Sequence, residues 1–242
     1  MKKEKNISQF SNDVTSHSGY VYTSNGRLSS EMANERLTRV VHDMIGKAAK
    51  GKTIIDVGCG DGTYTYDLLK LKPKSILGID PSREAIKKAM SKKRLPKQIT
   101  YKVHSIYELK KLKKRYDIAI VRGVLHHLYD APKAIKQLVQ IADIVLVIDP
   151  NGYNPILKII EKVSPYHRAH EEKSYAPHLL DKWFVTTKKA SVEERLFCGL
   201  VPFFCSNTLA RFLKFLEPLV EATPFLNKIA CAVYVQKIIV KR

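Results

Sequence analysis

The sequence predicts an α/β fold built on a doubly wound, mostly parallel sheet with helices on both faces. The apolar segments near 118–121 and 144–148 lack polar alternation, as parallel strands do when helices cover both of their sides. Such segments alternate with helical stretches along the chain. One apolar strand also runs into a glycine-rich loop and a helix start, which make half of a nucleotide-binding βαβ unit.

The expected elements follow this alternation in order. Residues 1–20 are polar and lack periodicity, so we expect the first part of the chain to be mobile. The apolar spacing from Ser29 to Ile45 predicts an amphipathic helix with Ser29 or Ser30 as its N-cap. Further helices are expected near 155–163 and 176–189. The strands are expected near 53–57, 75–80, 99–104, 116–121, 143–149, 191–199 and 230–240.

A long segment separates the last two strands. Residues 202–227 exceed what a hairpin needs and predict an amphipathic helix, with Arg211, Lys214 and Glu217 opposite its apolar face. We expect that face to pack onto the domain. A lid over an apolar acceptor, and a membrane or dimer contact, are the alternatives. The apolar face comprises Leu209, Phe212, Leu213, Leu216, Leu219 and Val220.

Length and composition set limits on the fold and the compartment. With 242 residues, 45% of them hydrophobic, the chain suits one α/β domain with additions. No apolar run reaches the ~18 residues of a membrane span, and none follows the charged start. We therefore expect a cytoplasmic protein. Its cysteines have neither disulfide-framework nor metal-ligand spacing, and they lie at positions 59, 198, 205 and 231.

The glycine loop after the first expected strand points to a ligand. Glycines at 58, 60 and 62 let the backbone turn sharply and approach a bound molecule closely. Asp56 and Asp61 bracket these glycines, and their carboxylates would repel a phosphate. A cationic ligand without phosphate suits this loop better than a dinucleotide does.

The loop and two later segments resemble the class I S-adenosylmethionine-dependent methyltransferases. The family's first motif, Asp/Glu-x-Gly-x-Gly-x-Gly, is matched from Asp56 to Gly62. A second strand ends in Asp80, 24 residues after Asp56, and a third segment ends in Arg122-Gly-Val-Leu-His-His. The resemblance covers about residues 50–150. It implies S-adenosylmethionine as the cofactor and a Rossmann-like, seven-stranded sheet with an antiparallel last strand.

The resemblance also implies a cofactor-binding set. Asp80 is the expected ribose ligand, with a helix N-cap as its alternative role. Where the family often carries an acid for the adenine amino group, this chain has none until Glu108, so His104, Ser105 or a backbone carbonyl must serve. Cys59 is expected to be a small buried side chain instead of a nucleophile. The full set is Asp56, Gly58, Cys59, Gly60, Thr63, Asp80, Pro81, His104, Ser105 and Arg122.

The chain is expected to have two parts. We expect an N-terminal cap segment and helix at 1–46 and the methyltransferase domain at 47–242, with insertions near 150–175 and 202–227. Within the first part, residues 19–27 could lie over the cofactor cleft or simply pack beneath the first helix.

Histidines are the candidate general bases. Methyl transfer needs positioning, and an alcohol, phenol or ammonium acceptor must also lose a proton. Of His126 and His127 at the end of the fourth strand, one should face the cleft and the other pack under the next helix, and we favour His127. His167 is the second candidate. His167, His170, Glu171 and Glu172 resemble a metal site, but such spacing is typical of solvated polarity and we expect no metal.

The methyl acceptor is the open part of the prediction. The net charge of +19 is concentrated at 47–115, with 19 Lys/Arg against 6 Asp/Glu, and the lysine clusters lack interleaved aromatic residues. We interpret them as a solvated face and favour a small-molecule or lipid-like acceptor, because the additional segments are aromatic and apolar. Peripheral membrane contact is compatible with this interpretation. An RNA or other nucleic-acid acceptor, and a non-catalytic cofactor-binding module, are the alternatives.

Overall fold

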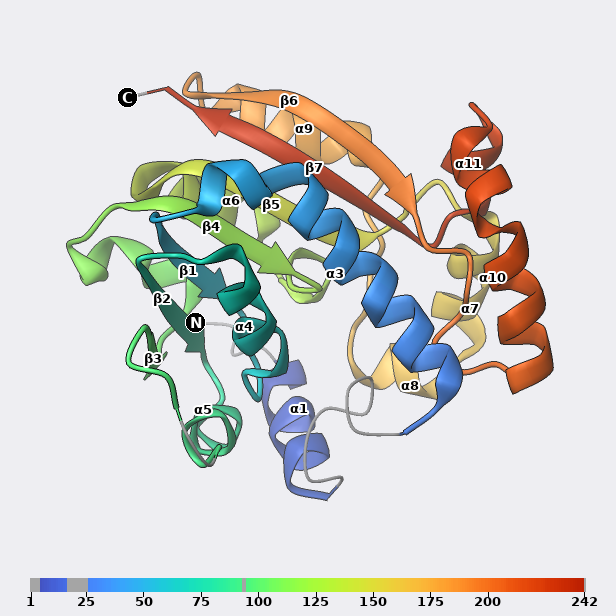
Figure 1. Ribbon diagram of the computed structural model, residues 1–242, viewed down its shortest axis with the longest axis horizontal. Helices are drawn as coiled ribbons and strands as arrows, with labels where there is room; N and C mark the ends of the chain where they lie inside the picture. The colour runs from blue at the N-terminus through green and yellow to red at the C-terminus, as the bar shows by residue number, and fades with distance from the viewer. Residues whose placement is uncertain (1–4, 17–25, 93–94, 242) are drawn as a thin grey trace.

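A computed structural model describes residues 5–16, 26–92 and 95–241, which form an α/β fold around one seven-stranded sheet (Figure 1). The strand order is β3-β2-β1-β4-β5-β7-β6, and β7 runs antiparallel to both of its neighbours while β1 to β5 are parallel. This confirms the predicted Rossmann-like sheet. The strands are β1 (Thr53–Val57), β2 (Ser75–Asp80), β3 (Ile99–Val103), β4 (Tyr116–Arg122), β5 (Ala142–Pro150), β6 (Ala190–Cys198) and β7 (Val233–Val240).

Helices cover both faces of this sheet and extend beyond one end of it. The 3₁₀ helices are η1 (Leu68–Leu71), η2 (Ile106–Leu112) and η3 (Leu125–His127). The α-helices are α1 (Lys5–Ser16), α3 (Leu28–Ala49), α4 (Thr63–Asp67), α5 (Arg83–Met90), α6 (Ala131–Ile141), α7 (Pro155–Val163), α8 (Pro165–Ala169), α9 (Pro177–Thr186), α10 (Asn207–Ala222) and α11 (Leu226–Ala230).

Alternate residues of the central strands supply two separate cores. Ile54 packs with residues of α3 and η1 on one face, whereas Ile55 packs with residues of α6 and α9 on the other. The same alternation holds in β4 and β5, where every residue from Val145 to Ile148 is buried. Because helices cover both faces, these strands have continuous apolar sequences. Their positions could therefore be predicted from the sequence.

The strand order places a ligand site at the carboxyl ends of β1 and β4. The chain winds from β1 to β2 and β3 on one side and then returns to β4 on the other, so the connections diverge between β1 and β4. In open α/β sheets, ligands bind at such a switch point. The glycine loop follows β1, and η3 with its two histidines follows β4.

The caps of two helices differ from the prediction. Helix α3 begins at Leu28 with Arg27 as its N-cap, because Ser29 and Ser30 are buried in the first turn and both hydroxyls donate to the carbonyl of Phe203. Helix α5 is capped by Ser82, whose hydroxyl accepts from Ala85 N, so the alternative role of Asp80 as a cap was wrong. The carboxylate of Asp80 is therefore available to the site.

The expectation of a mobile first part was wrong for Lys5–Ser16, which form α1. This helix packs against α5, buries Val14 and places Ser11 Oγ 2.9 Å from Ser82 Oγ. An isolated polar stretch has no strong periodic signal, and its helical form depends on this contact. The possibility that 19–27 cover the cleft falls largely outside the described residues, which resume at residue 26.

The helix in the long insertion forms as predicted, but the expectation that its apolar face packs onto the domain holds only in part. Leu213, Leu216 and Val220 are partly buried, whereas other members of the predicted apolar face are exposed. Glu217 is only 3% exposed, because Lys214 pairs with it and Leu200 N donates to it. Among the described residues, no helix has the length and apolar character needed to cross a bilayer.

Candidate functional site

The glycine loop has a backbone shape that side chains would prevent. Gly58 and Gly62 have φ values of +76° and +74°, in the left-handed region that favours glycine. A Cβ on Gly58 would lie 2.3 Å from Val124 Cγ2, and one on Gly62 would lie 2.3 Å from the Tyr101 hydroxyl oxygen. The loop is thus fitted closely against the start of η3 and against β3, with bare backbone at its turns.

Asp80 closes this loop from the neighbouring strand. One carboxylate oxygen accepts from Gly60 N at 3.0 Å and the other accepts from Ser82 N at 2.8 Å. The side chain is buried, and burial raises its pKa to about 6. The two hydrogen bonds lower the pKa, but their effect is smaller. Each oxygen keeps acceptor capacity beyond its backbone bond, which suits a pair of ligand hydroxyls.

Asp56 and Arg122 lie together on the α3 side of the sheet. Thr65 Oγ1 donates to Asp56 at 2.5 Å, and burial raises the pKa of Asp56 to about 6. The Arg122 guanidinium stacks over the ring of Tyr64 at 3.5 Å and donates to Asn34 and Thr38 of α3. Asp56, Tyr64 and Arg122 line one small cavity between the sheet, α3 and α4.

The other predicted cofactor residues surround Asp80 and the loop. His104 N donates to the Asp80 carbonyl at 3.0 Å, and Ser105 accepts from Tyr107 N, which starts η2. Cys59 is buried, and burial raises the pKa of its thiol far above its usual range, so it is not a nucleophile. Pro81 is exposed directly after Asp80, and Lys92 donates to Thr63 Oγ1 at 3.2 Å.

These residues fit the cofactor implied by the sequence. The loop presents bare backbone where a Cβ would collide, and Asp80 offers a buried carboxylate for ribose hydroxyls. Asp61 is also buried and accepts from Thr63 N at the start of α4, so the helix N-terminus that would hold a phosphate already has an anion. The donor and acceptor set therefore suits a cationic, phosphate-free nucleoside.

A second polar cluster lies at the ends of β4 and β5. His126 Nδ1 and Asp149 Oδ1 are 2.9 Å apart, and both side chains are buried. Burial lowers the pKa of His126 to about 3. It also raises the pKa of Asp149 well above its usual value, although backbone hydrogen bonds from residues 124–126 lower it. When Asp149 is ionised, a neutral His126 donates from Nδ1 to its carboxylate and keeps the lone pair of Nε2.

His127, His167 and Glu172 complete this cluster. The His127 ring lies 3.8 Å from the His126 ring, centroid to centroid, and His167 Nε2 lies 3.2 Å from Glu172 Oε2. Burial lowers the pKa of His127 well below 6.5 and also lowers that of His167. It raises the pKa of Glu172 to about 8. The structure thus brings both predicted bases to one place, with a carboxyl group between them.

Three of these residues also have the chemistry of metal ligands. His126, His127 and Glu172 each offer one ligand atom, and these atoms lie within 4.8 Å of one another. Two imidazoles and a carboxylate suit Zn²⁺, whose tetrahedral ligands lie about 3.4 Å apart. A metal ion would therefore have to draw the cluster together.

Asp149 is the residue that the predicted site lacked, whereas Glu172 was named beside His167 but given no role in proton transfer. Asp149 had a usable signal, since it ends β5 directly beside β4, where Arg122 pairs with Ile148, and parallel neighbours end at the same edge. The local sequence placed Glu172 beside His167 but gave no sign that it lies near His126 and His127. The segment after α8 turns back to η3, where Lys173 N donates to the His126 carbonyl at 3.1 Å.

Comparisons with known proteins agree with this geometry. A family model described as a methyltransferase domain matches residues 29–211. The tRNA U34 carboxymethyltransferase of Campylobacter fetus subsp. fetus is 32% identical over 90 residues, which are 37% of this chain and 32% of that protein. The mitochondrial ubiquinone biosynthesis O-methyltransferase of Bos taurus is 36% identical over 112 residues, 44% of this chain and 28% of that protein. The chain thus spans about a third of the length of the curated relatives it matches.

Solved structures extend the likeness over the whole fold. The crystal structure of magnesium protoporphyrin IX methyltransferase from Synechocystis PCC 6803 with bound S-adenosylmethionine aligns with a TM-score of 0.64 at 16% identity. The alignment covers 100% of this chain and 99% of that one, which shows that the fold is shared from end to end.

Proposed function

Because the chain belongs to the methyltransferase domain family, we propose that this S-adenosylmethionine-dependent methyltransferase methylates a hydroxyl or amino group of a small-molecule or lipid-like acceptor. The observation that carries the proposal is a cluster beside the end of β4, in which His126 and Asp149 are buried and His127, His167 and Glu172 are partly buried. A cluster able to receive a proton is needed when the acceptor atom carries one.

When bound, S-adenosylmethionine supplies an electrophilic methyl group. In this proposal, Asp80 accepts the ribose hydroxyls, since its two oxygens are oriented by Gly60 N and Ser82 N. The bare backbone from Gly58 to Gly62 lies along the methionine part, and His104 and Ser105 flank the adenine. Asp56 and Arg122 hold the loop, β4 and α3 in register. We also propose that the N-terminal part of the chain acts as a cap, since α1 contacts Ser82.

We assign the proton transfer to His127, Glu172 and His167. His127 is partly buried at the end of β4, and its lowered pKa keeps the imidazole neutral at physiological pH, so it can accept a proton. A carboxylate oxygen of Glu172 and a ring nitrogen of His127 lie within 4.8 Å of each other, and Glu172 also contacts His167. His167 is nearer the surface, so the proton leaves through this pair. His126 positions His127 by ring contact and is held by Asp149.

The lipid-like character of the acceptor rests on the surroundings of this cluster. His167 lies on α8, directly after α7, and α7 exposes Ile156, Ile159 and Val163. An acceptor with an apolar tail would find apolar side chains on one side and the histidines on the other. RNA is the second candidate, because the net charge is +19 and tRNA U34 carboxymethyltransferases are among the relatives.

Labelled S-adenosylmethionine incubated with the protein and cell extract tests the proposal. Label is expected in the organic-solvent or small-metabolite fraction. His127→Gln should lose most of that label while binding S-adenosylhomocysteine like the wild type. His178→Gln is a matched control, because His178 is exposed and bonds Tyr153 outside the cluster. Label found only in RNA and removed by ribonuclease would overturn the proposed acceptor.

A further inference from the structure

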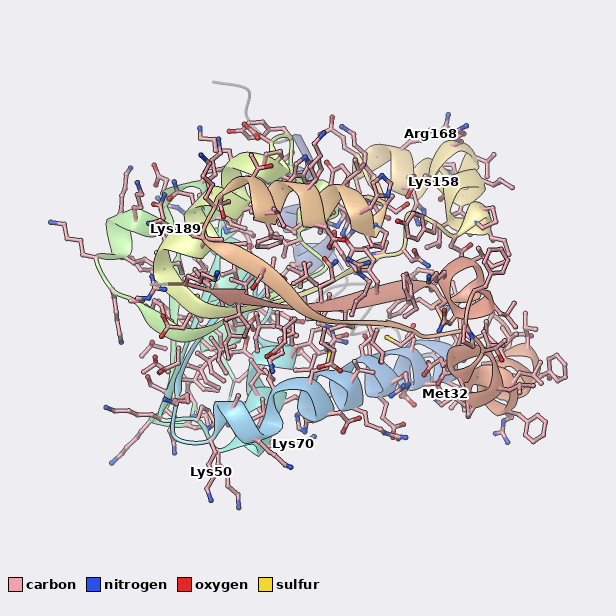
Figure 2. The ribbon with its side chains drawn as sticks, turned by 90° about the horizontal axis from the view of Figure 1, so that it is seen from above. Met32, Lys50, Lys70, Lys158, Arg168 and Lys189 are labelled. Atoms are coloured by element: carbon pink, nitrogen blue, oxygen red, sulfur yellow. The ribbon has the colours of Figure 1, made fainter. Side chains whose placement is uncertain are left out.

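A large exposed apolar surface lies on helices α7, α10 and α11, and we call it the apolar face. Ten of the seventeen large apolar side chains exposed in the described part of the chain belong to these helices or to Phe225, the N-cap of α11. The helices gather at one end of the molecule (Figure 1), and in Figure 2 aromatic rings extend outward from this region. Monomeric proteins rarely expose apolar surface so concentrated without a partner.

Helix α10 is oriented with its aromatic residues outward. Phe215 is 81% exposed and Phe212 is 57% exposed, while Glu217 faces the protein. Glu217 is held there by Lys214 and by Arg36 of α3, and Arg36 also donates to Glu221. These contacts fix the acidic side of α10, Glu217 and Glu221, against the protein. The opposite side, with Phe212 and Phe215, is therefore exposed by a defined packing arrangement.

Helices α7 and α11 continue the same surface. Helix α7 has no buried residue, and its exposed side carries Ile156, Ile159 and Val163. Its N-cap Asn154 donates to the Ala230 carbonyl at the end of α11, which fixes the two helices together. Phe225, the N-cap of α11, has φ +71° and is 71% exposed, so a strained backbone presents a phenyl ring to solvent.

The exposed charges of these three helices are all cations. Lys162 lies on α7, Arg211 on α10 and Lys228 on α11, whereas Glu161, Glu217 and Glu221 all lie in ion pairs and are less exposed. An apolar surface with cations is the pattern of a helix lying in the interface of a bilayer with anionic lipids. A second copy in a two-fold dimer would bring these like charges together, and an RNA would leave the rings in water.

From this arrangement we infer that the apolar face docks the protein on an anionic bilayer surface, without any segment crossing the bilayer. The inference goes beyond the proposed function and does not depend on the acceptor, because docking is measured without turnover. It places α7, and with it the His167 side of the site, next to the membrane surface.

Co-sedimentation with vesicles tests the inference. The full chain should sediment with phosphatidylglycerol/phosphatidylethanolamine vesicles and much less with phosphatidylcholine vesicles. Phe212→Ser and Phe215→Ser should each weaken binding about tenfold or more, and Arg211→Gln and Lys228→Gln about fivefold each. Val185→Ser and Met90→Ser, which change exposed apolar residues on α9 and α5, should bind like the wild type.

Calorimetric binding of S-adenosylhomocysteine checks that every variant is folded. A wild type that stays in the supernatant with anionic vesicles overturns the inference. So do Phe212→Ser and Phe215→Ser variants that sediment as well as the Val185→Ser control. A wild-type dimer in light scattering that Phe215→Ser converts to a monomer, without vesicle binding, would instead assign the face to a second copy.

Discussion

Replacing Asp80 with asparagine separates ribose recognition from the rest of cofactor binding. Each Asp80 oxygen already accepts one backbone N–H, at 3.0 Å from Gly60 and 2.8 Å from Ser82, and keeps capacity for one hydroxyl. Asparagine has one acceptor oxygen, and its amide group would face either Gly60 N–H or Ser82 N–H as a second donor. Hydrogen bonds to charged groups contribute about 1.5–3 kcal/mol each. We expect affinity for S-adenosylhomocysteine to fall by about 2–3 kcal/mol, or about 30- to 150-fold.

Calorimetry with S-adenosylhomocysteine and its 2′,3′-dideoxy analogue measures the effect. The analogue lacks both hydroxyls, so Asp80→Asn should change its affinity little. Ser82→Ala is the matched control, because it removes the α5 cap and the contact with Ser11 but leaves the carboxylate. Wild-type affinity should fall as pH drops through about 6, where Asp80 becomes protonated. Equal losses for both ligands would refute the ribose assignment.

Three further predictions address the loop, the proton path and metal binding. Gly58→Ala should lower the melting temperature and the affinity for S-adenosylhomocysteine, because an alanine in the left-handed region costs about 1–2 kcal/mol and its Cβ would collide with Val124. Adding Val124→Ala should restore part of the stability. An unchanged melting temperature in Gly58→Ala would contradict the assigned backbone. Turnover should rise with pH through about 8, because burial raises the pKa of Glu172 to about 8 and only the ionised carboxylate accepts a proton. Glu172→Gln should abolish this rise in turnover. A wild-type rate that is flat from pH 7 to 9 would exclude Glu172 as a proton acceptor. Micromolar Zn²⁺ should inhibit turnover reversibly by binding to His126, His127 and Glu172. Stimulation by Zn²⁺, or loss of activity with a chelator, would instead indicate metal catalysis in place of the proposed proton path.

The strands and the cofactor half of the site were predictable because their signals are local. The predicted strand 53–57 is β1 itself, and the predicted 143–149 lies within β5, since strands covered on both faces must be apolar throughout. Within the glycine loop, the need for positive φ at Gly58 and Gly62 is also local. Asp80 ends a strand whose position was predictable.

The acceptor half was less predictable because its contacts join distant segments. His126 bonds to Asp149 on the next strand of the sheet, and Glu172 reaches His167 only because the chain turns back after α8. For α10, periodicity predicted an apolar face, but the expectation that this face packs onto the domain held only in part. The side that the protein covers depends on Arg36, more than 170 residues earlier, pairing with Glu217 and Glu221.

Helix α7 connects the apolar face with the proton-accepting cluster. Its outer side carries Ile156, Ile159 and Val163, while its inner side is bonded to the segment that follows Glu172. Lys158 Nζ donates to the Ser174 carbonyl at 2.5 Å, and Ser174 N donates to Glu161 at 2.6 Å. A change in the position of α7 would thus act on the chain two residues from Glu172. Anionic vesicles that bind the wild type should therefore alter turnover of a soluble acceptor, while Lys158→Met should weaken that effect without reducing vesicle binding.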